Sequence, residues 1–247
     1  MPSDPLAPLL DLADVAPALE QARAAVDAAM RHRALRRSGG PVAAEVALRT
    51  SVASAALDTH GFDLEGVRAG VVTDPVVHGA LRATAALDGL TGTWTRAPRQ
   101  VLARLHTLVA RDVVGPGELG RPVNPEVAPR LDALAALVAG GTSAPVLLQA
   151  AVVHGELLAL KAFAGPNGVV ARAAARLTLI AGGLDPRGLL AMDVGHRSRE
   201  PEYVGSANAF ATGTPDGVRS WLRHYAAAAE RAAEELVEVC EKAIDGG

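Results

Sequence analysis

The sequence predicts an all-α fold in a single domain, and three observations lead to that prediction. The 247 residues are 49% hydrophobic but only 3% aromatic, so the core must be built mainly from Ala, Val and Leu, which favours helices over strands. Apolar residues recur at helical spacing, and no run shows the sustained alternation of a strand. The sequence has no internal repeat, and its length suits one large domain.

Charge and cysteine content exclude several classes of protein. The net charge of −3 gives no electrostatic reason to expect a nucleic-acid or anionic-membrane partner. No apolar run approaches the roughly 20 residues that span a bilayer, and residues 1–8 lack the pattern of a secretory signal. The single cysteine, Cys240, is typical of a reducing compartment. We therefore expect a cytoplasmic protein.

Two helices are predicted in the first 57 residues. The first spans residues 14–37, with Pro17 in its first turn, where a missing N–H costs nothing. Basic residues near its end complement the helix dipole. The segment Ser-Gly-Gly-Pro at 38–41 is expected to break the chain before a second helix at 42–57.

Proline and glycine residues mark the ends of the later helices. Asp74-Pro75 and Ala97-Pro98 each place a proline at the first position of a helix. Residues 60–70 read as a loop or short helix, and the Gly/Pro-rich segment 115–125 is expected to be irregular. The further predicted helices lie at 74–87, 97–109, 127–138, 143–160, 168–181, 201–210 and 215–244.

The turn at 161–167 joins two of these helices and carries the candidate binding site. The backbone N–H groups of Asn167, Gly168 and Val169 point out of the helix N-terminus, an arrangement that attracts anions. Arg172, one turn later, adds a guanidinium that can bind phosphate. Asn167 is also the expected N-cap. The alternative is an ordinary helix–turn–helix with a surface arginine.

This turn resembles the signature of the Fic family, H-P-F-x-[DE]-G-N-G-R-x-x-R. The matching residues are Phe163, Asn167, Gly168 and Arg172. The departures are Lys161 for histidine, Ala162 for proline, Gly165 for the acid, Pro166 for the first glycine and Val169 for the first arginine. Flanking segments at 154–158, 183–186 and 213–218 resemble an actinobacterial branch of Fic-like proteins. The resemblance covers roughly residues 42–228.

The resemblance implies a Fic-like helical bundle and a scaffold for transfer of AMP from a nucleotide to a protein hydroxyl. In the family, the histidine accepts the hydroxyl proton and the acid holds Mg²⁺ on the phosphates. Lys161 can serve as a base only if burial lowers its pKa by several units, and Gly165 has no oxygen for a metal. We therefore expect a pseudoenzyme that has lost AMPylation. It would keep a site for ATP, another nucleotide or another anion, without Mg²⁺, at Asn167, Gly168 and Arg172.

Two other functions stay open. In the first, the protein is an active nucleotidyl- or phosphotransferase with Lys161 and His154 as its catalytic residues, since the seven-residue spacing puts both on one helical face. The alternatives for these two residues are a dipole-stabilised lysine and a hydrogen-bonded core histidine. In the second, the chain is an assembly module that binds a protein partner or a second copy through helix 14–37 or 215–244. No histidine pairs with an acid at metal-site spacing, so no metal site is expected.

A second element of the Fic family is an inhibitory helix with the pattern [ST]-x-x-x-E-[GN], whose glutamate pairs with the second motif arginine and blocks the nucleotide. The segment from Ser54 to Asp58 and Thr59 resembles it, although Asp58 is one methylene shorter than glutamate. Glu65 is a competing candidate, and either acid can instead belong to a loop or cap. We expect Asp58 or Glu65 to pair with Arg172 and fill the phosphate site.

The resemblance also bears on the flap and on domain boundaries. Family members use a β-hairpin flap to dock the target peptide. The matching segment here, 117–125, contains two prolines, which oppose strand pairing. We expect the flap to be reduced or absent. The chain is accordingly divided into an N-terminal helical extension, 1–41, and a Fic-like helical domain, 42–247, that includes the C-terminal helices.

Overall fold

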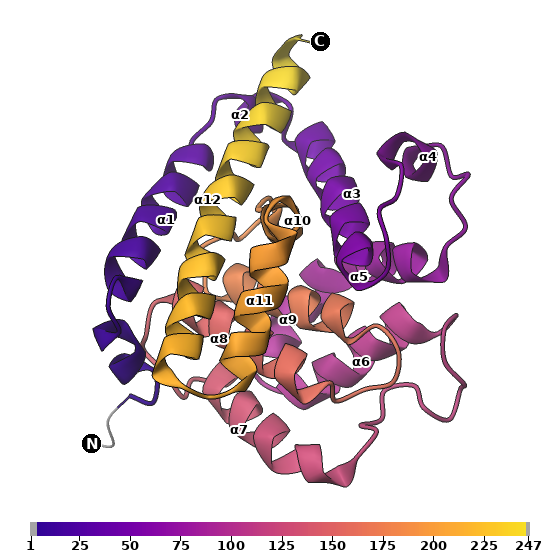
Figure 1. Cartoon of the computed structure of the whole chain (residues 1–247). Coiled ribbons are helices and arrows are strands. Elements are labelled where there is room, and N and C mark those ends of the chain that lie inside the picture. The colour runs from indigo at the N-terminus through magenta and orange to yellow at the C-terminus, as the bar shows by residue number, and fades with distance from the viewer. Residues whose placement is uncertain (1–3, 246–247) are drawn as a thin grey trace.

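The computed structural model describes residues 4–245, and in that part of the chain every regular element is a helix (Figure 1). The all-α prediction is therefore confirmed. Residues 1–3 and 246–247, at the outer ends of the predicted segments 1–41 and 42–247, lie outside the described residues. The helices are η1 (Ala7–Asp11), α1 (Val15–Ala29), α2 (Ala34–Arg37), α3 (Gly39–Asp58), α4 (Leu64–Arg68), α5 (Pro75–Trp94), α6 (Pro98–Ala110), η2 (Pro125–Val127), α7 (Ala128–Val138), α8 (Val146–Leu160), α9 (Asn167–Ala181), α10 (Met192–Ser198), α11 (Glu200–Ala211) and α12 (Pro215–Asp245).

Helices α8 and α9 form the centre of the molecule, with the other helices around them (Figure 1). Both are buried along most of their length. One apolar cluster joins α8 to α1, α10, α11 and α12. A second joins α8 and α9 to α3, α5, α6 and α7. Since the central pair contributes to both clusters, the turn between α8 and α9 is held in place from two sides.

The first and last long helices lie side by side (Figure 1). Helix α1 buries Val15 and Val26, and α12 buries Trp221 and Leu236. The two helices are also linked at one end, where Arg219 Nε donates to the carbonyl of Ala13 over 2.7 Å. Their apolar faces therefore pack inside the molecule. Along the chain from 4 to 245, no helix is long and apolar enough to cross a membrane.

The N-terminal boundaries differ from those expected. The predicted helix 14–37 is divided into α1 and α2. The predicted break at 38–41 is confined to Ser38, because α3 already begins at Gly39. Proline and glycine are tolerated in the first turn of a helix, where no intrahelical N–H donor is lost. The boundary proposed at residue 41 therefore lies within α3.

Two later elements also differ from the prediction. Helix α5 continues to Trp94 instead of ending near residue 87, and its last residue is fully buried. Helix α10 was not predicted, because a helix of seven residues is too short for its periodicity to stand out.

The segment between α6 and η2 consists of turns and irregular backbone, without a strand in residues 111–124. Its contact with the motif turn is a backbone hydrogen bond from Val123 N to Ala162 O of 2.9 Å. The structure thus has no hairpin flap at the predicted position, and the segment covers one side of the motif turn.

Candidate functional site

The motif turn begins at Lys161, which ends α8 in a left-handed conformation with φ of 44°. The Lys161 side chain is exposed, whereas Phe163 is buried and stacks on His106 with ring centroids 4.8 Å apart. His106 Nδ1 accepts a hydrogen bond from Gly120 N, so Nε2 carries the proton and donates to Ala164 O over 2.8 Å. The contacts of His106 with Phe163 and Ala164 therefore hold the motif turn against α6.

Asn167 closes the turn with its own side chain. Its Oδ1 accepts from Phe163 N over 3.0 Å, and its Nδ2 donates to Phe163 O over 2.5 Å. The predicted N-cap role was wrong, because these bonds point back into the turn and Pro166 precedes the first helical residue. Gly165 has a φ of 75°, a conformation that residues with a side chain rarely adopt. The position where the family has an acid is thus built for glycine.

Arg172 lies one turn into α9 and is 2% exposed. Its Nη2 donates to Asp58 Oδ1 over 2.6 Å and to the carbonyl of Ser54 over 2.7 Å. Its Nε donates to Ser54 Oγ over 2.9 Å and lies 3.3 Å from Asp193 Oδ1, while Nη1 donates to the hydroxyl of Tyr203 over 2.9 Å. The guanidinium is therefore bound by α3, α10 and α11 at once.

The Asp58 carboxylate lies against the N-terminus of α9. Its Oδ2 accepts from the Val169 N–H at 3.3 Å, while its Oδ1 binds Arg172. A Cβ atom added at Gly168 would collide with this carboxylate, so the close approach requires glycine there. Glu65, the competing acid, is 73% exposed at its side chain and pairs with Arg68 at 3.2 Å. The contact with Arg172 is thus made by Asp58 and Ser54 of α3.

Burial and charge decide the protonation of this cluster. Burial lowers the pKa of Arg172, but Tyr203, Asp58 and Asp193 more than offset it, so the pKa is raised above its ordinary value. Burial raises the pKa of Tyr203 to about 12, so the phenol keeps its proton and stays neutral. The site therefore combines one guanidinium with two carboxyl groups, so Arg172 has its counterions within the chain and needs no ligand to balance its charge.

His154 and Lys161 occupy different environments despite their shared helical face. His154 is fully buried, with Nε2 3.1 Å from the hydroxyl of Tyr203. Burial, followed by the charge of Arg172, lowers its pKa well below the ordinary value, so the ring is neutral. Among the described residues, the Lys161 side chain makes no hydrogen bond or ion pair. His154 supports the Arg172 cluster through Tyr203, whereas Lys161 faces solvent.

Two members of the cluster, Asp193 and Tyr203, were not identified from the sequence. Asp193 lies in α10, which gives no periodic signal of its own. Tyr203 lies in a predicted helix, but nothing in its spacing connects it with Arg172. The available signal was compositional: a tyrosine in a chain with only 3% aromatic residues is a natural candidate for a buried hydrogen bond.

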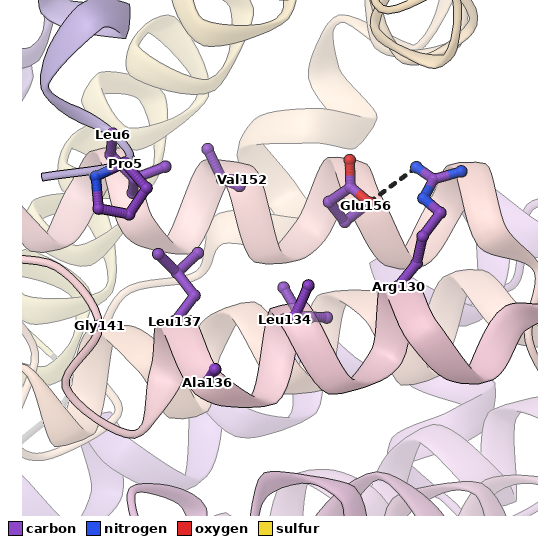
Figure 2. Close-up of a pocket in the computed structure, with 10 residues that line it drawn as sticks. Pro5, Leu6, Arg130, Leu134, Ala136, Leu137, Gly141, Val152 and Glu156 are labelled. Atoms are coloured by element: carbon purple, nitrogen blue, oxygen red, sulfur yellow. Dashed lines mark hydrogen bonds and ion pairs between the residues drawn. The ribbon is translucent and has the colours of Figure 1, made fainter. Parts of the chain in front are cut away.

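The described residues contain no group of three or more His, Cys, Asp or Glu side chains that could hold a metal ion. A groove of about 470 Å³ lies elsewhere, between the N-terminal segment, α7 and α8 (Figure 2). Its lining is apolar apart from the ion pair of Arg130 with Glu156 at 2.7 Å. None of the motif residues lines this groove, which is therefore separate from the Arg172 cluster.

Comparison with known proteins gives a structural likeness only. The sequence matches no protein family model and no curated protein. The structure resembles a Fic family protein from Desulfovibrio desulfuricans G20, with a TM-score of 0.69 and 23% identity over 90% of this chain and 74% of that one. The chain has the Fic fold. The expected Fic-like helical bundle is thereby confirmed.

Two further Fic structures support the assignment. A segment of C. elegans Fic-1 gives a TM-score of 0.73 at 18% identity, covering 95% of this chain and 75% of that one. A variant of the same segment gives 0.72 at 19% identity over 94% and 74%. Because the identities are this low, the likeness shows the Fic fold alone.

Proposed function

We propose that this Fic-fold protein does not catalyse AMP transfer and that Asp58 occupies its phosphate site. The observation that carries the proposal is the placement of the Asp58 carboxylate between Arg172 Nη2, at 2.6 Å, and the backbone N–H of Val169, at 3.3 Å. An anion at a helix N-terminus beside a guanidinium is the arrangement that a nucleotide phosphate would use. The carboxylate supplies the same charge from within the chain.

The loss of catalysis is supported by the two positions that would carry the chemistry. Lys161 is exposed, and among the described residues its side chain makes no hydrogen bond or ion pair that would position it as a general base. Gly165 offers no metal ligand, and its φ of 75° disfavours any replacement with a side chain. A missing general base alone costs about 10²–10⁴ in rate, and the missing metal adds to that loss.

The proposed role is that of a regulatory or scaffold protein whose nucleotide site opens when the end of α3 moves away. Ser54 and Asp58 hold Arg172 from the last turns of α3, so displacement of this helix end would free the guanidinium and the N-terminus of α9 together. ATP or another nucleotide would then bind through its phosphates at Gly168 and Arg172, without Mg²⁺.

The experiment that tests the lost chemistry is incubation of the protein with labelled ATP, Mg²⁺ and a cell lysate. We expect no label on any protein, either with the wild type or with Asp58→Ala, in which the site is open. Label transfer that disappears in Lys161→Ala would show an active centre built on this lysine and would contradict the proposal. Lys161 makes no described side-chain contact, so this variant should fold normally.

A further inference from the structure

The surface formed by the start of α11 and the first half of α12 contains a cationic pocket of about 390 Å³. We call it the α11–α12 pocket, and its lining residues are Arg199, Arg219, Ser220, Arg223, His224 and Ala227. Such a concentration of guanidinium groups around a hollow is the chemistry that binds phosphate and other oxyanions.

The carboxylates near this pocket form close ion pairs with only part of its arginine lining. Arg199 pairs with Glu202 at 2.7 Å, and Arg219 pairs with Asp14 at 2.7 Å. Arg223 reaches only the already paired Asp14, at 3.9 Å, and its side chain is 52% exposed. Three guanidinium groups thus face two carboxylates, and Arg223 is the one most available to a ligand.

His224 provides a second, independent observation. It is 5% exposed, and its Nδ1 is buried without a hydrogen-bond partner among the described residues. Its Nε2 is 3.1 Å from His196 Nδ1. The Nε2 atom therefore has a hydrogen-bond partner within the protein, whereas Nδ1 has none among the described residues. A buried polar atom without a partner is unfavourable, and a ligand that reached it from the pocket would remove this penalty.

We propose that the α11–α12 pocket binds the phosphate group of a small phosphorylated molecule. The phosphate would accept hydrogen bonds from Arg223, from the free nitrogens of Arg199 and Arg219, and from the Ser220 hydroxyl, with His224 as a further donor. The pocket volume lies within the usual range for small ligands, which favours a phosphate monoester of low molecular weight. This site is independent of Arg172 and of the proposed loss of catalysis.

The test is calorimetric titration with inorganic phosphate and with ribose 5-phosphate at constant ionic strength. Arg223→Ala is the informative variant, because among residues 4–245 the only ion pair that it removes is the long contact with Asp14, and Arg223→Glu reverses the charge at the same place. We expect saturable binding to the wild type, about tenfold weaker binding to Arg223→Ala and weaker binding still to Arg223→Glu, since one charge-assisted hydrogen bond is worth about a factor of ten or more.

A matched variant keeps the result specific to the pocket. Arg104→Ala removes an exposed arginine from α6, so it should bind ribose 5-phosphate as the wild type does. Binding that is equal in Arg223→Ala and wild type, or binding that is weakened as much by Arg104→Ala as by Arg223→Ala, would overturn the proposal. So would the absence of saturable binding below about 10 mM.

Discussion

Arg172 is the residue on which the candidate site depends. A buried guanidinium is tolerated only when its donors and its charge are satisfied, and here Asp58, Asp193, Ser54 and Tyr203 meet both needs. The sequence could predict the position of Arg172 one turn into the helix and its pairing with an acid from residues 54–65. It could not predict that burial would be complete, because the covering residues come from α10 and α11.

Arg172→Ala should destabilise the protein by about 3–5 kcal/mol, because it leaves Asp58 and Asp193 without their buried countercharge. Urea denaturation of the variant and the wild type measures the difference in the free energy of unfolding. Arg104→Ala, which removes an exposed arginine, should change it by less than about 0.5 kcal/mol. A loss below about 1 kcal/mol for Arg172→Ala would show that the cluster is not a tightly coupled buried network.

At the scale of elements, the helices that begin with an Asp-Pro or Ala-Pro pair were predictable, since these residues act within one turn. The Ser-Gly-Gly-Pro segment was predicted to interrupt the helices over residues 38–41. Glycine and proline can also form the first turn of a helix, and here residues 39–41 begin α3. Helix α10 escaped prediction because its position is set by tertiary packing: Gly195 lets it approach the backbone of α12 so closely that a Cβ atom would collide with the carbonyl of Ala228.

Gly195→Ala should therefore destabilise the protein by about 1–3 kcal/mol, the usual cost of overpacking. Gly205→Ala is the matched control, because Gly205 lies inside α11 with no atom within 4 Å of an added Cβ. There alanine should stabilise the helix by about 0.5–1 kcal/mol. Thermal unfolding of the two variants should give melting temperatures that shift in opposite directions, and an equal shift would refute the close contact between α10 and α12.

Several titratable groups lie in the interior of the molecule. Burial lowers the pKa of His154 and His196 well below the ordinary value. It also lowers the pKa of His224 to about 4, with smaller effects of Glu202 and Arg199. Burial acts in the other direction on Asp185, whose pKa is raised to about 6. These shifts make the stability of the whole fold depend on pH.

The direction in which stability changes with pH depends on whether the folded or the unfolded state binds more protons. Below about pH 6.5 the unfolded chain protonates its histidines, while the folded protein keeps His154, His196 and His224 neutral, so stability is lost as the pH falls. Asp185 has the opposite effect between about pH 4 and 6, because there the folded state binds the extra proton. The three histidines together outweigh this single carboxyl group.

We expect the free energy of unfolding to fall from pH 7 to pH 5. Urea denaturation across this range measures it, and Asp185→Asn should make the fall steeper because it removes the opposing group. A stability that is flat or that rises toward pH 5 would contradict the burial of the neutral histidines.

We propose that Asp58 fills the phosphate site of a Fic fold. Titration calorimetry of ATP without Mg²⁺ into wild type, Asp58→Ala and Glu65→Ala tests it most directly, with Glu65 as the exposed neighbouring acid. We expect Asp58→Ala to bind ATP at least about tenfold more tightly than the wild type, and Glu65→Ala to behave as the wild type. Equal affinity of Asp58→Ala and wild type would contradict it.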